Sequence, residues 1–132
     1  MEELFADLWQ GPRLMASRRG FRPAVDVYRS ETPPVVIVVV ELAGIDPDAI
    51  ELFLTDGLLV IRGVRRRQAG DHRIVHMEVD YGPFERRVLI SDPVDADAVE
   101  TTYSQGFLLV TLPIAERPSQ PLRVEITKRT SK

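Results

Sequence analysis

Ile50-Glu51-Leu52-Phe53-Leu54-Thr55-Asp56-Gly57-Leu58-Leu59-Val60-Ile61-Arg62-Gly63 is the stretch of this sequence that decides its fold. Ile50, Leu52 and Leu54 alternate with other residues, so in a β-strand they share one face. Asp56-Gly57 lies between two such runs, and both residues tolerate the positive φ that a type I′ turn requires. The stretch therefore predicts an antiparallel hairpin with one buried face.

Similar β-rich runs continue in both directions, separated by turn residues about every ten positions, a spacing typical of an all-β, immunoglobulin-like sandwich. Val35–Val40 is continuously apolar, which predicts a central strand covered on both faces. Gln105-Gly106 indicates a second hairpin, and Asp46-Pro47-Asp48 a single helical turn capped by its first aspartate, with Asp95-Ala96-Asp97 as a similar case. The expected strands are 24–31, 35–42, 50–55, 58–64, 73–80, 84–90, 98–103 and 107–113.

The sandwich, residues 24–114, is flanked by two segments of different character. In the first segment, 1–23, apolar residues have helical spacing until Gly11-Pro12 ends the pattern, and a linker follows. These apolar residues are Leu4, Phe5, Leu8 and Trp9. The sequence thus predicts a short amino-terminal arm.

The last segment, 115–132, contains Leu122, Val124 and Ile126 in alternation after a proline-bracketed spacer. Such a lone strand gains backbone hydrogen bonds by adding to an exposed sheet edge. The spacer from Ile114 to Leu122 spans ~25 Å when extended, enough to reach a neighbouring subunit. The other interpretation makes it the last strand of the chain's own sheet.

Composition restricts the possible functions. With 132 residues, 44% hydrophobic and 28% charged, the chain is one globular domain, and a net charge of −3 argues against nucleic-acid binding. The absence of cysteine removes disulfides and thiolate chemistry and fits a cytoplasmic location. The acidic start Met1-Glu2-Glu3 is unlike a signal peptide, and Val35–Val40 is too short to span a membrane.

The sequence shows no catalytic motif. His72 and His76 have helical metal-ligand spacing but lie in a strand-like or looped region, so we expect no metal. Asp92, Asp95, Asp97 and Glu100 lack the glycine and terminal glutamate of a calcium loop, and capping explains them better. The basic run 65–67 is expected to be a solvated loop. We therefore expect no enzyme activity, no catalytic residue and no cofactor.

Six segments of the chain together form a specific pattern. They are Pro23-Ala24-Val25-Asp26-Val27-Tyr28, Val40-Glu41-Leu42-Ala43-Gly44-Ile45, Asp56 through Gly63, Tyr81-Gly82-Pro83-Phe84-Glu85-Arg86, Ala98 through Leu108, and Val110-Thr111-Leu112-Pro113. In order and spacing these segments resemble the small heat-shock proteins, the α-crystallin-domain family, and specifically their bacterial and plant branch. The resemblance covers about 100 of the 132 residues. Departures are Ala43 in place of proline, Leu89-Ile90-Ser91 in place of Leu-Pro, and Phe107-Leu108-Leu109 in place of Val-Leu-Thr, which adds bulk on one face.

The resemblance implies an ATP-independent holdase that binds partly unfolded proteins, forms dimers and assembles further. Val124-Glu125-Ile126 matches the family's I-x-I/V motif, with Leu122 before it, and the motif docks in a groove on a neighbouring subunit. The matching groove residues are Ile50, Leu52, Leu54, Val99, Thr101 and Tyr103. The alternative is a non-chaperone adaptor or co-chaperone of the related p23 and CS-domain type, binding one folded partner.

The resemblance also implies a dimer interface. Arg86 matches an arginine that supports it, and the loop 66–80 matches a loop whose short strand is exchanged between partners. His76, Met77, Glu78 and Val79 would lie on or near that strand. The arm residues Leu4, Phe5, Leu8 and Trp9 are expected to serve clients and assembly.

Overall fold

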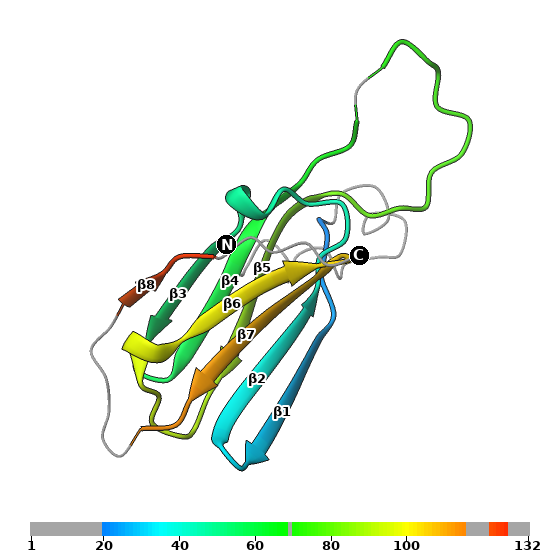
Figure 1. Ribbon diagram of the computed structural model, residues 1–132. Helices are drawn as coiled ribbons and strands as arrows, with labels where there is room; N and C mark the ends of the chain where they lie inside the picture. Colours follow the sequence, from blue (N-terminus) through cyan, green and yellow to red (C-terminus); the bar gives the residue numbers. More distant parts are fainter. Residues whose placement is uncertain (1–19, 69, 116–121, 127–132) are drawn as a thin grey trace, which may run out of the picture.

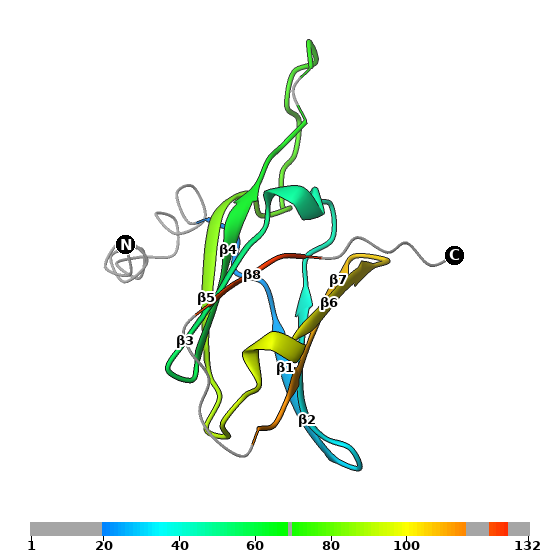
Figure 2. The same cartoon turned by 60° about the vertical axis from the view of Figure 1, so that its left-hand side comes forward.

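Two antiparallel four-stranded sheets pack face to face in the computed structural model, which describes residues 20–68, 70–115 and 122–126 (Figures 1 and 2). One sheet has the strand order β1-β2-β7-β6 and the other β5-β4-β3-β8. The strands are β1 (Val25–Glu31), β2 (Pro34–Glu41), β3 (Glu51–Thr55), β4 (Leu58–Arg65), β5 (Gly82–Leu89), β6 (Glu100–Ser104), β7 (Phe107–Pro113) and β8 (Leu122–Val124). The predicted all-β sandwich is confirmed.

The core lies between the sheets and is built by the alternating residues of the strands. Leu52 and Leu54 on β3, and Leu108 and Val110 on β7, are at most 5% exposed. On β2, Val36, Val38 and Val40 are buried, whereas the residues between them are only partly buried. The expectation that β2 is covered on both faces is therefore wrong, because one face of a two-sheet sandwich points away from the core.

Both predicted hairpin turns are confirmed. Asp56 and Gly57 have φ values of 48° and 80° and join β3 to β4, with Thr55 opposite Leu58. Gln105 and Gly106 have φ values of 52° and 85° and join β6 to β7. Positive φ at both central positions is what a type I′ turn requires.

The two helical turns are also confirmed. In η2 (Pro47–Ala49), the Asp46 side chain accepts a hydrogen bond from the Asp48 backbone N–H at 3.0 Å, and Pro47 occupies the first turn. In η3 (Ala96–Ala98), Asp95 accepts from the Asp97 N–H at 3.2 Å. Each aspartate satisfies a donor that a helix start leaves unpaired, so capping accounts for these carboxylates.

The strand predicted at 73–80 is wrong for the single chain. These residues belong to an extended loop that projects away from the sandwich (Figure 1). An extended segment becomes a strand only when a neighbouring strand pairs with its backbone, and the loop points away from both sheets. The eighth strand is instead β8, from the carboxy-terminal segment.

Candidate functional site

The first candidate site is the groove where the edges of the two sheets approach each other, next to β3 and β6. β8 pairs with β3 there, with Val124 opposite Leu52 and Leu122 opposite Leu54 (Figure 2). Val124 is 8% exposed and belongs to the hydrophobic core, and Ile126 packs against that core while partly buried. The carboxy-terminal segment therefore fills the groove of its own chain. Of the two interpretations that the sequence leaves open, this is the one that makes it the last strand of the chain's own sheet.

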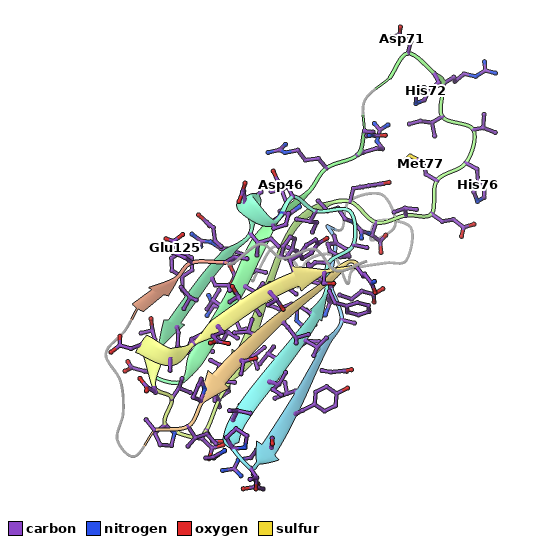
Figure 3. All side chains as sticks on the ribbon, viewed as in Figure 1. Asp46, Asp71, His72, His76, Met77 and Glu125 are labelled. Carbon is purple, nitrogen blue, oxygen red and sulfur yellow. The ribbon has the colours of Figure 1, made fainter. Side chains whose placement is uncertain are left out.

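β6 holds the same segment from the other side of the groove. The Thr101 hydroxyl donates a hydrogen bond to the Glu125 backbone oxygen at 3.3 Å. Thr101 is 2% exposed, so this bond gives a buried polar group a partner. Glu125 itself points outward, as Figure 3 shows, and its side chain is exposed.

The remaining groove residues named from the sequence lie in the same region. Ile50 is buried ahead of β3, and Val99 packs against the core just before β6. Tyr103 also packs against the core, and its hydroxyl donates to the Leu42 backbone oxygen at 2.7 Å. Within one chain, Leu52 and Leu54 pair with the tail segment and Thr101 hydrogen-bonds to it, whereas Ile50, Val99 and Tyr103 pack in or against the hydrophobic core.

The second candidate site is the projecting loop. His72, His76 and Met77 are all found on it (Figure 3). Its apolar side chains are strongly exposed, with Ile74 at 49%, Val75 at 88% and Val79 at 57%. His76 and Glu78 are hydrogen-bonded to each other, with 2.6 Å between His76 Nε2 and Glu78 Oε2. Exposed apolar residues gathered on one segment are typical of interaction surfaces, and the exchange of this loop between partners stays a prediction.

Arg65, expected in a solvated loop, instead ends β4 and organises the base of the projecting loop. Its guanidinium carbon lies 3.6 Å from the centre of the Phe21 ring, and Nε donates to the Asp80 backbone oxygen at 3.0 Å. Nη1 donates to the Ala43 backbone oxygen at 3.2 Å. Sequence reasoning missed this role because all three partners are distant in the chain.

Arg86 lies on β5 and also binds within its own chain. Its Nη1 donates to the Pro23 backbone oxygen at 2.6 Å. Burial, together with the nearby positive charge of Arg22, lowers the pKa of Arg86. The contact ties β5 to the segment that enters β1, and the role of Arg86 in a dimer stays a prediction. Leu4, Phe5, Leu8 and Trp9 lie outside the described residues.

In the part of the chain that the structure describes, no three histidine, cysteine, aspartate or glutamate side chains gather as a metal site would need. Within the same ranges, no helix is both long and apolar enough to cross a membrane.

The sandwich, its tail-filled groove and its projecting loop define the α-crystallin domain, and the chain belongs to the Hsp20/alpha crystallin family, whose profile matches residues 29–127. Among curated relatives, it is 30% identical to heat shock protein 16 of Schizosaccharomyces pombe over 132 residues, covering 96% of this chain and 91% of the relative.

Solved structures give the same result. Heat shock protein 16.0 from Schizosaccharomyces pombe superposes with a TM-score of 0.67 at 28% identity, covering 81% of this chain and 99% of that one. A small heat-shock protein from Xylella fastidiosa, described as having a distinct high order structure, gives 0.63 at 30% identity and covers 80% and 95%. The chain is thus a small heat-shock protein.

Proposed function

We propose that this chain is an ATP-independent holdase that binds partly unfolded proteins and keeps them from aggregating. A chaperone role follows from the family. The observation that carries the proposal is the loop 66–81, where Val75, Met77 and Val79 are each at least 50% exposed although the domain already has a complete core. Aggregating chains expose apolar patches, and a binder for them needs apolar surface of its own.

Assembly is the second part of the proposal. We expect the loop to pair with the edge of a partner's sheet, since an unpaired edge is otherwise open to uncontrolled association. β1 and β5 are edge strands of the described sheets and offer such edges. The tail segment Val124–Ile126 is expected to move between its own groove and that of a neighbour.

The expected location of the protein is the cytoplasm, which suits a chain without cysteine.

The adaptor alternative is not favoured. The sequence profile and the structural neighbours belong to small heat-shock proteins, and the chain has both the tail segment and a groove of its own that accepts it. An adaptor would form a stoichiometric complex with one folded partner and would ignore unfolded ones.

Light scattering from a heat-labile reporter protein, at near-equal mass and without ATP, tests holdase action. We expect the chain to suppress scattering, and V124G/I126G or removal of the first 20 residues to weaken that suppression. Glu125→Gly is the matched control, because it adds a glycine to the same segment while removing an exposed side chain. Unchanged aggregation of the reporter while this chain stays folded would reject the proposal.

Sedimentation velocity tests the loop exchange. Met77→Asp combined with Val79→Asp should convert dimers to monomers, because charged side chains in a paired, apolar strand are costly to bury. Dimers of unchanged affinity in this double variant would show that the interface lies elsewhere.

A further inference from the structure

The outward face of the sheet β1-β2-β7-β6 carries an apolar strip that neither the groove nor the loop explains. Residues opposite each other in an antiparallel pair share a face, so the register places Tyr28 beside Ile37, and Val39 beside Leu109. Tyr28 is 54% exposed, Phe107 45% and Leu109 37%. We call this strip, with Phe107 beside it, the outer apolar strip.

Carboxylates border the outer apolar strip. Asp26 is opposite Val39, Glu41 is opposite Phe107, and Glu100 pairs across from Thr111 on the same face. The outward-pointing residues of β1, β2, β7 and β6 include neither arginine nor lysine. The whole chain has 17 basic and 20 acidic residues, so the one-sided charge of this face is a local property.

The position of the strip decides how a partner binds there. β2 and β7 are interior strands, and their backbones pair with neighbouring strands on both sides. A partner therefore cannot add a strand at the centre of the strip and has to bind through side chains. The face also points away from the groove that holds β8 (Figure 2), so both surfaces can be occupied at once.

We propose that the outer apolar strip is a separate client-binding surface that selects apolar segments carrying arginine or lysine. Apolar side chains of the client cover Ile37, Val39 and Leu109, while its cations face Asp26, Glu41 and Glu100. Charge complementarity of this kind sets specificity and the rate of encounter. The inference rests on the proposed holdase function and adds a class of preferred client to it.

The experiment uses the full chain and two labelled peptides with the same leucine and phenylalanine residues, one with four arginines and one with four glutamates in their place. Fluorescence anisotropy measures both affinities at low and at high salt. We expect the arginine peptide to bind about tenfold more tightly at low salt, with the preference shrinking as salt screens the charges. Equal affinities at low salt would overturn the proposal.

Two variants locate the site. D26N/E41Q/E100Q should remove most of the preference, whereas E51Q/D56N/E85Q, which makes the same change in net charge on the other sheet and its hairpin turn, should leave it intact. Retention of the preference in the first variant would overturn the proposal.

The apolar part of the site is tested separately. Leu109→Thr should weaken binding of both peptides several-fold, because it removes apolar contact and leaves the carboxylates in place. Equal binding of both peptides by Leu109→Thr and the unaltered chain would overturn the apolar half of the argument.

Two further outcomes separate the possible explanations. If the arginine peptide binds only after residues 1–19 are removed, the strip is covered by the chain's own arm and the proposal is wrong. If the peptide preference follows the three carboxylates but the reporter aggregates unprotected, the holdase function fails while the strip stands as a binding surface. Protection of the reporter together with equal peptide affinities rejects the strip alone.

Discussion

Replacing Val124 with alanine tests how firmly β8 holds the groove of its own chain. The side chain is 8% exposed and belongs to the core, so the change removes two methyl groups from an apolar site. At about 0.8 kcal/mol for each buried carbon, docking of the segment weakens by about 1.6 kcal/mol. That loss increases the population of the undocked segment about 15-fold.

The effect is expected to stay local. β8 pairs with β3 through only three positions at the edge of a sheet, and short edge elements open without global unfolding. Amide hydrogen exchange within β8 should accelerate about 15-fold, while exchange in β2 and β7 changes little. Val27→Ala is the control, because it makes the same substitution at a residue on β1 that is 50% exposed.

Two results would refute this reasoning. Unchanged exchange in β8 would mean that the segment is not held by Val124. An equal acceleration in β2 and β7 would mean that β8 is part of the cooperative core, so that it opens only when the whole domain unfolds.

Three other predictions concern stability. Gly57→Ala should lower the free energy of unfolding in urea by roughly 1 kcal/mol more than Gly44→Ala. Both positions have positive φ, but of the two only a Cβ at Gly57 would meet a backbone oxygen, that of Ile90 at 2.8 Å. Equal losses of stability in the two variants would contradict this. Arg65→Lys should make proteolysis of the loop 66–81 faster, since lysine cannot stack and donate to two carbonyls at once; unchanged proteolysis would show that the loop base is held otherwise. Asp46→Ala should cost about 1 kcal/mol through loss of the cap, and a neutral result in urea unfolding would mean that Pro47 alone maintains the turn.

The sequence predicted those features whose causes are local. Asp56-Gly57 requires only its own backbone preference to turn the chain, and the alternation around it assigns one face to the core. The cap at Asp46 is similar, since donor and acceptor are two residues apart. For this reason the hairpins, the helical turns and most of the strands follow from short patterns.

Features that depend on a distant or external partner were harder to predict. The run 73–80 has strand-like composition, yet the single chain gives it no neighbouring strand. Arg65 stacks on Phe21 and binds Ala43, and neither contact leaves a signal in a window around position 65. The tail segment fits the groove by its alternation, but alternation cannot tell the chain's own groove from that of a copy.

The docked tail has a consequence for how assembly responds to dilution. Six residues, 116–121, join the sandwich to β8, and a tether that short presents the segment to its own groove at an effective concentration of about millimolar. A segment from a neighbouring molecule has to outcompete it. If tails exchange between molecules as proposed, dilution favours chains whose tail is docked in their own groove, and high protein concentration favours exchange. On that proposal, the length of this tether sets the concentration at which one state gives way to the other.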